Sequence, residues 1–150
     1  MNRIIVIAML AVFFSACTQK KVVEATYENG DPKVVKYYQK NDGALELNKE
    51  IVYYENQQKK MEGTYKARVR DGKWKAWYEN GTIWSEGEYK NGKRDGLGIA
   101  YHENGRKYIE GMYREDVRVG VWRFYDTTGV MVKEVNFDLV PKTQEIDTVN

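Results

Sequence analysis

A 24-residue repeat constrains this chain more than any other feature of its sequence. Gly81, Gly105 and Gly129 lie 24 residues apart, and no insertion or deletion interrupts that spacing between residues 53 and 137. Five further columns of residues keep the same phase, and their first members are Glu62, Tyr65, Arg70, Gly72 and Trp77. Self-similarity at a fixed period is typical of repeat arrays, in which neighbouring units stabilise one another.

Each unit is predicted to be a β-hairpin. Asn80-Gly81 and Asn104-Gly105 lie between alternating apolar and polar residues, and an Asn-Gly pair in that setting indicates a two-residue type I′ turn with positive φ at both positions. The turn fixes a register in which opposite charges face each other, as they should in a stable sheet. The expected cross-strand pairs are Trp77–Trp84, Lys75–Glu86, Trp74–Gly87, Tyr101–Tyr108, Gly98–Gly111, Arg123–Glu134 and Trp122–Val135.

The fold class that follows is all-β: a repeat array of antiparallel β-hairpins that forms one elongated twisted sheet. Consecutive hairpins are expected to be joined by loops such as residues 90–96. Side chains alternate between the two faces of a strand. We expect one packed face, where glycine lets a ring such as Trp74 lie over Gly87. Rings of one column are expected to run along this face: Tyr65, Tyr89, Tyr113 and Phe137. The second face is expected to carry ion pairs and a ladder of rings: Tyr53, Trp77, Trp84, Tyr101, Tyr108 and Tyr125.

Residues 1–16 are predicted to be a lipoprotein signal peptide. The apolar run from Ile4 to Phe14 is too short to span a bilayer, which needs about 20 helical residues. The sequence Phe-Ser-Ala-Cys that ends at Cys17, the only cysteine, resembles the lipobox of bacterial lipoproteins. That resemblance implies an acylated Cys17 as the first mature residue and attachment to the membrane. The alternative is an ordinary secretory signal that is removed together with the cysteine.

The rest of the chain divides around the repeats. Residues 17–26 are expected to be the acylated cysteine and a tether, residues 27–137 the hairpin repeats, and residues 138–150 a flexible C-terminal tail without periodicity. Thr18 is not acidic, and by resemblance to lipoproteins of bacteria with two membranes this implies the outer membrane, facing the periplasm.

Several motifs of the repeat resemble those of a known family. Tyr-Glu-Asn-Gly, Glu-Gly-Glu-Tyr-Lys-Asn-Gly-Lys and Asp-Gly-Lys-Trp resemble MORN repeats, in the bacterial variant of proteins labelled YwqK-family antitoxins. The resemblance covers residues 27–137 and departs from the pattern at Gln57 and at residues 126–129. It implies a β-hairpin array that serves as an interaction surface, and its label implies a toxin as the partner.

The sequence offers little that indicates catalysis. His102 is the only histidine, so no Ser-His-Asp triad and no histidine metal cluster is expected, and we read it as a degenerate repeat position. The column Glu62, Glu86, Glu110 and Glu134 suggests either a carboxylate pair for glycoside cleavage, a calcium ladder, or charge pairing within the sheet. We expect pairing, and therefore no enzyme, metal or cofactor; a hydrolase that uses Glu86 or Glu110 is the alternative. The formal net charge of +2 argues against nucleic-acid binding.

Two surfaces are candidates for binding. Exposed rings grip sugars and proteins well, and Trp77, Trp84, Tyr101 and Tyr108 are the candidate binding surface; the alternative is that these rings only stiffen the sheet. The column Arg70, Arg94 and Arg118 is expected on loops, either at anionic lipid or at a solvated edge. We expect a non-enzymatic envelope lipoprotein that binds or scaffolds an unidentified protein or glycan through its sheet face; the alternative is an antitoxin or immunity protein that neutralises a cognate toxin.

Overall fold

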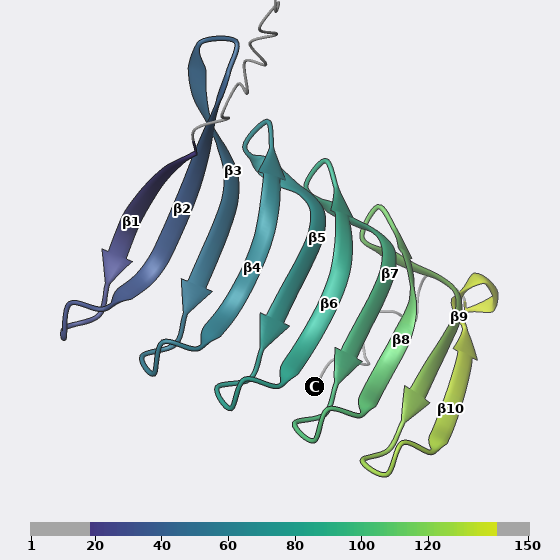
Figure 1. Cartoon of the computed structure of the whole chain (residues 1–150). Helices are drawn as coiled ribbons and strands as arrows, with labels where there is room; N and C mark the ends of the chain where they lie inside the picture. Colours follow the sequence, from purple (N-terminus) through teal and green to yellow (C-terminus); the bar gives the residue numbers. More distant parts are fainter. Residues whose placement is uncertain (1–18, 141–150) are drawn as a thin grey trace, which may run out of the picture.

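The computed structural model describes residues 19–140, which form one open antiparallel sheet of 10 strands in chain order (Figure 1). The prediction of an all-β hairpin array is confirmed. The strands are β1 (Lys20–Thr26), β2 (Pro32–Asn41), β3 (Ala44–Tyr53), β4 (Lys59–Lys66), β5 (Val69–Trp77), β6 (Ile83–Lys90), β7 (Lys93–Tyr101), β8 (Lys107–Arg114), β9 (Val117–Tyr125) and β10 (Met131–Asn136), followed by the short 3₁₀ helix η1 (Phe137–Leu139).

The two ends of the chain differ in part from the expected division. The expected signal peptide (1–16), Cys17 and residues 141–150 of the expected tail lie outside the described residues. Residues 20–26, expected in a tether, form β1 and pair with β2. At the other end, the side chain of Asp138 accepts a hydrogen bond from the backbone N–H of Gly120 at 2.9 Å. In the described part of the chain, no helix has the length and apolar character needed to cross a membrane.

The turns at Asn80-Gly81 and Asn104-Gly105 differ from the predicted type I′ geometry. The N–H of Gly81 donates to the carbonyl of Tyr78 at 2.9 Å, and the N–H of Tyr78 donates to the carbonyl of Thr82 at 2.8 Å. Gly81 has a φ of 86°, whereas Asn80 is not among the residues with positive φ. Its side chain instead accepts from the N–H of Thr82 at 2.8 Å. This is a type I turn followed by a left-handed glycine, a wider hairpin turn than the sequence motif suggested.

The wider turn changes the pairing near the hairpin tip but not beyond it. Trp77 pairs with Ile83, Ala76 pairs with Ser85, and Trp84 is left as a bulge between them. The predicted Trp77–Trp84 pair is therefore wrong, and so is Tyr101–Tyr108, because Tyr101 pairs with Lys107. The bulge adds one residue to the strand after the tip and restores the register. Pairs farther from the tip are therefore confirmed: Lys75–Glu86, Trp74–Gly87, Gly98–Gly111, Arg123–Glu134 and Trp122–Val135.

Tight two-residue turns connect the hairpins at the opposite ends of the strands. Asn91 has a φ of 51° and Gly92 a φ of 86°, and they lie between the paired residues Lys90 and Lys93. Positive φ at both central positions defines a type I′ turn. The loop expected over residues 90–96 is therefore only this turn, and the type I′ geometry predicted for the Asn-Gly motif occurs one strand later.

Hydrogen bonds near the turns, at both ends of the strands, join each hairpin to the next. Near the Asn-Gly turns, the hydroxyls of Tyr54 and Tyr78 donate to the carbonyls of Trp77 and Tyr101, each at 2.8 Å. The ring of His102 takes the same place and lies 3.0 Å from the carbonyl of Tyr125, which fits its interpretation as a repeat position. At the other end of the strands, the N–H of Gly92 donates to the carbonyl of Arg70 at 2.8 Å.

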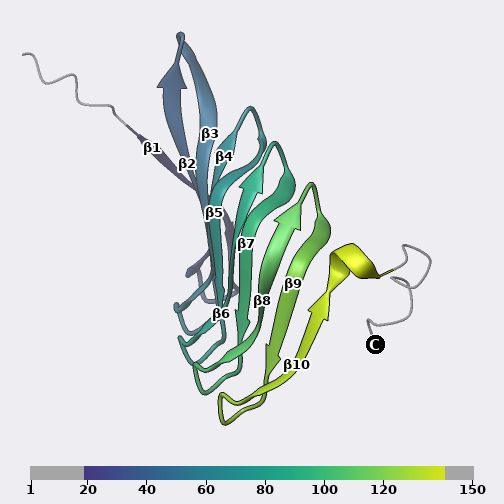
Figure 2. The same cartoon turned by 90° about the vertical axis from the view of Figure 1, so that its right-hand side faces the viewer.

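The sheet is a single layer, as the view turned by 90° shows (Figure 2), and rings pack against one another on one side of it. We call this side the aromatic face and define it by Trp74, Tyr89, Tyr113 and Trp122. Trp74 and Trp122 are 4% and 2% exposed. Each contacts rings of the neighbouring column edge to face, with Trp74 at 5.3 Å from Tyr65 and Trp122 at 4.8 Å from Tyr113. The predicted row of rings is confirmed.

The indoles of Trp74 and Trp122 each lie over a glycine. For Trp74 this is not the glycine that we expected. A Cβ atom added to Gly63 would overlap the indole of Trp74, and one added to Gly111 would overlap that of Trp122. We expected Trp74 over Gly87. The ring leans toward β4 instead, and the nearest atom to a Cβ added at Gly87 is a backbone oxygen at 3.8 Å.

The other side, which we call the charged face, carries the ion pairs. Lys75 and Glu86 lie 3.2 Å apart, and Arg123 and Glu134 lie 3.1 Å apart. Only toward the N-terminal end does this face bury apolar side chains, with Val35 1% and Ile51 5% exposed.

The glycine–indole contacts make a testable prediction about stability. Gly111→Ala should displace Trp122 and lower the free energy of unfolding by on the order of 1–3 kcal/mol, the usual effect of overpacking. Gly87→Ala is the matched control, since its Cβ meets no side chain, and it should stay within about 0.5 kcal/mol of the wild type. Urea unfolding followed by circular dichroism measures both. Equal losses in the two variants would contradict the proposed packing.

Candidate functional site

The carboxylates of the repeated glutamate column are all paired on the charged face. Glu62 contacts Lys49 and Lys59, and Glu110 lies 2.7 Å from Lys107. Burial alone would raise the pKa of Glu62, but the two ammonium groups lower it overall. The hydrogen bond from Lys107 is the largest cause of the lowered pKa of Glu110.

These pairs favour charge pairing over the other two interpretations of the column. A carboxylate with a lowered pKa stays ionised and is a poor general acid. Among residues 19–140, no group of three or more His, Cys, Asp or Glu side chains is placed to hold a metal ion.

Tyrosines complete this network. The hydroxyl of Tyr101 donates to Glu86 at 2.6 Å, and that of Tyr125 donates to Glu110 at 2.6 Å. The hydrogen bond from Tyr101 is the largest cause of the lowered pKa of Glu86. Burial, together with the hydrogen bond to Glu86, raises the pKa of Tyr101 to about 12. Tyr101, a predicted binding residue, is therefore engaged within the sheet.

The predicted aromatic ladder is divided by the bulges. Trp77 lies on the charged face, with the ammonium of Lys59 at 5.7 Å from its ring centre. Trp84, in contrast, is 51% exposed and lines a cleft on the aromatic face. Tyr108 is 48% exposed and contacts His102, with ring centres 5.0 Å apart. Four residues expected to act together therefore do not form one surface, and Cys17 lies outside the described residues.

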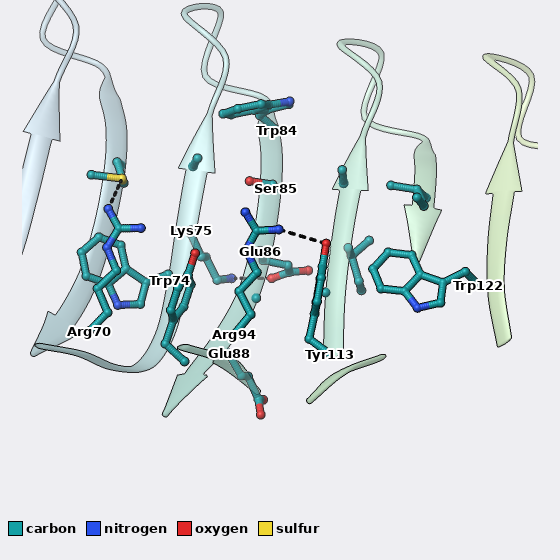
Figure 3. A pocket seen from close by; sticks show the side chains of 18 residues that line it. Arg70, Trp74, Lys75, Trp84, Ser85, Glu86, Glu88, Arg94, Tyr113 and Trp122 are labelled. Atoms are coloured by element: carbon teal, nitrogen blue, oxygen red, sulfur yellow. Dashed lines mark hydrogen bonds and ion pairs between the residues drawn. The ribbon is translucent and has the colours of Figure 1, made fainter. Parts of the chain in front are cut away.

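A cleft of about 400 Å³ opens on the aromatic face across β5 to β8. This volume falls within the range of ~300–1,000 Å³ that is usual for ligand pockets. Trp74 and Trp122 stand at its two sides, with Arg94 and Tyr113 between them and Trp84 near the Asn-Gly turn (Figure 3). Much of the lining is apolar or bare backbone: Met61, Ala76, Gly87, Gly98, Ala100 and Ile109. Glu86, which also lines it, is held by Lys75 on the charged face.

The arginine column differs from its predicted place on a solvated or lipid-facing edge. The guanidinium of Arg70 lies 4.0 Å from the ring centre of Trp74, and that of Arg118 lies 4.7 Å from Trp122. Arg94 lies 5.1 Å from the ring of Tyr113 and donates to its hydroxyl at 3.0 Å. Within residues 19–140, none of these guanidinium groups forms an ion pair with a carboxylate. The cleft therefore combines aromatic walls with positive charge.

Sequence reasoning missed Gly98 and the arginine stacking, although the repeat contains a signal for both. Residues 74, 98 and 122 form one column that reads Trp, Gly, Trp, so the middle unit lacks the ring that its neighbours have. Arg70 and Arg118 each precede a tryptophan by four residues, which places both side chains on the same face of a strand.

Comparison with known proteins identifies two segments of the chain. The MORN repeat variant matches residues 70–91 and 118–138, which supports a MORN-repeat protein. No curated protein and no solved structure matches the chain.

The Tyr101–Glu86 pair makes a prediction about alkaline pH. The raised pKa of Tyr101 gives stability that is complete below the ordinary value of 10.0 and is lost as the pH rises through about 12. Tyr101→Phe should therefore cost about 1 kcal/mol at neutral pH, and its difference from the wild type should shrink across that interval. Urea unfolding at several pH values measures this difference, and Glu86→Gln should lower the pKa of Tyr101 in an ultraviolet titration. Ionisation of Tyr101 near pH 10.0 in the folded protein would contradict the assignment.

Proposed function

We propose that this MORN-repeat protein is a non-enzymatic binding or scaffold module that holds a protein or a glycan on its aromatic face. The cleft carries the proposal: it combines an exposed indole, Trp84, with guanidinium groups that have no carboxylate partner among the residues that the structure describes. Such side chains supply large rigid contact area and directed charge, and they dominate binding energy at interfaces. The repeated glutamates of the charged face are already paired, which leaves the aromatic face as the better binding surface.

A protein fits the cleft better than a glycan does. Bound sugars need hydrogen-bond partners for many hydroxyl groups, because unpaired polar groups lose free energy when they leave water. Ser85 and the hydroxyls of Tyr89 and Tyr113 are the main neutral polar groups of the lining, and Tyr113 is already engaged with Arg94. Apolar side chains of a protein partner would meet the apolar lining directly.

We place this module at the cell envelope, as an outer-membrane lipoprotein that faces the periplasm and is anchored through acylated Cys17. The apolar run before Cys17 and the lipobox-like sequence support this placement. Because β1 begins at Lys20, two residues, Thr18 and Gln19, separate the anchor from the sheet, and the three Cα–Cα steps from Cys17 to Lys20 span about 11 Å at most. The antitoxin role implied by the YwqK-type resemblance would use the same face, with a periplasmic toxin as its partner.

A comparison of two tryptophans tests the proposal. Chemical crosslinking in the native envelope, followed by mass spectrometry, should recover partners from the wild type and lose them with Trp84→Ala, because truncation of an interface hot spot costs about 2 kcal/mol or more, roughly 30-fold in Kd. Trp77→Ala is the matched control on the charged face and should keep them. If the partners are still recovered with Trp84→Ala but are lost with Trp77→Ala, binding occurs on the charged face and the proposal is wrong. A recovered toxin would establish the antitoxin role.

A further inference from the structure

The repeat forms the same receptor for an indole three times; by receptor we mean a glycine over which an indole of the next strand can pack. In the first copy, Gly63 of β4 lies under Trp74 of β5, and in the third, Gly111 of β8 lies under Trp122 of β9. Gly87 of β6 is the equivalent glycine of the middle copy, 24 residues from each. Because a Cβ at either filled position would overlap the ring, the glycine is what admits the indole.

The middle receptor has no indole. The residue that would supply it is Gly98, and the ring of Tyr113 leans over this residue, with Cε2 at 2.8 Å from where a Cβ would stand. No side chain lies within 4 Å of a Cβ added at Gly87. The cleft described above is therefore the vacant position between two filled ones, as Trp74 and Trp122 at its sides show (Figure 3).

The groups that hold the indole in the filled copies are present around the vacancy. Arg70 stacks on Trp74 and Arg118 on Trp122; Arg94 is their counterpart, and it is exposed at the cleft. The indole N–H of Trp74 donates to the carbonyl of Thr64 at 3.0 Å, and that of Trp122 to the carbonyl of Met112 at 3.2 Å. The counterpart of these two acceptors, 24 residues from each, is the carbonyl of Glu88, a residue that also lines the cleft.

We infer that the cradle formed by Gly87, Gly98 and Arg94 binds an aromatic side chain, tryptophan best of all, that a partner protein inserts there. The inference rests on the proposed function and specifies the chemistry of its partner. The filled copies define that chemistry: a flat ring that stacks under a guanidinium and donates one N–H. Residues 141–150 contain no aromatic residue, and the aromatic residues of 1–18 are Phe13 and Phe14 of the expected signal peptide. We therefore assign the ring to a partner protein.

Peptide titration tests the inference on the protein from residue 18 onward, with Cys17 and the signal omitted as in a soluble periplasmic form. The probe is a capped Gly-Trp-Gly peptide, followed through the amide NMR shifts of the protein. We expect saturable shifts at Gly87, Gly98 and Arg94, with a Kd on the order of 1 mM for so small a ligand. A capped Gly-Leu-Gly peptide and cellobiose, a neutral glycan, should bind at least tenfold more weakly.

Three variants separate the cradle from the rest of the face. Gly87→Ala puts a methyl group where the ring must lie, and Gly98→Trp supplies the missing indole within the chain. Both variants should bind the Trp peptide at least tenfold more weakly than the wild type. Gly98→Trp should also raise the urea midpoint of unfolding. The matched control is Leu97→Ala. Leu97 is adjacent to Gly98 and 45% exposed, but its side chain lies on the charged face with Lys75 and Glu86, so the variant should leave binding unchanged.

The outcomes distinguish this inference from the proposed function. Equal binding of the Trp peptide to wild type and Gly87→Ala, or tighter binding of cellobiose, overturns the cradle. In the envelope crosslinking, partners lost with Trp84→Ala but retained with Gly87→Ala leave the face as a binding surface and overturn ring insertion. Partners retained with both variants overturn both proposals. A self-association that Gly87→Ala abolishes, measured by sedimentation, would make a second copy of the chain the occupant and overturn the assignment to a different protein.

Discussion

An indole lying over a bare glycine is the contact on which this single-layer sheet depends. A sheet normally buries one face against a second layer, but within residues 19–140 no second layer is present. Trp74 and Trp122 obtain their burial within the sheet instead, because Gly63 and Gly111 let the rings approach the backbone and the arginines cover them from outside. Packing that is built entirely from neighbouring strands gives the array its stability one unit at a time.

This mode of packing also explains why the fold tolerates the vacancy at Gly98. Losing one indole from a conventional core leaves a cavity that destabilises the whole domain. Here the hydrogen bonds at both ends of the strands, such as those of Tyr78 and Gly92, still join the middle hairpin to its neighbours. Replacement of the indole by Gly98 therefore opens a cleft without separating the strands, and the proposed binding surface is an interruption of the same pattern that stabilises the fold.

The fold could be predicted from the sequence because the repeat fixes many contacts at once. The pairs Lys75–Glu86 and Trp122–Val135 were predictable from the turn position and the two-residue alternation of strands. The turn itself was not, because Asn-Gly fits both a type I′ turn and a type I turn with a left-handed glycine. The two readings differ by one residue at the tip, and that residue decides on which face Trp84 lies. The candidate site was therefore only partly predictable: Trp84 was among the predicted residues and lines the cleft, whereas Trp77 and Tyr101, which were grouped with it, lie on the charged face. The importance of Gly98 could have been recognised only by comparing the repeats with one another and noticing that the middle one lacks a tryptophan.

The spacing of the strands sets a length scale along the array. Adjacent strands lie about 4.8 Å apart, so each 24-residue unit extends the array by about 10 Å. The vacancy between β6 and β7 lies roughly 25 Å along the array from β1, the end to which the proposed lipid anchor at Cys17 would be joined. Gain or loss of one whole repeat before the vacancy would move it by one such step while preserving its chemistry. If the protein is anchored and binds as proposed, the number of repeats would set the distance between the anchor and the bound partner.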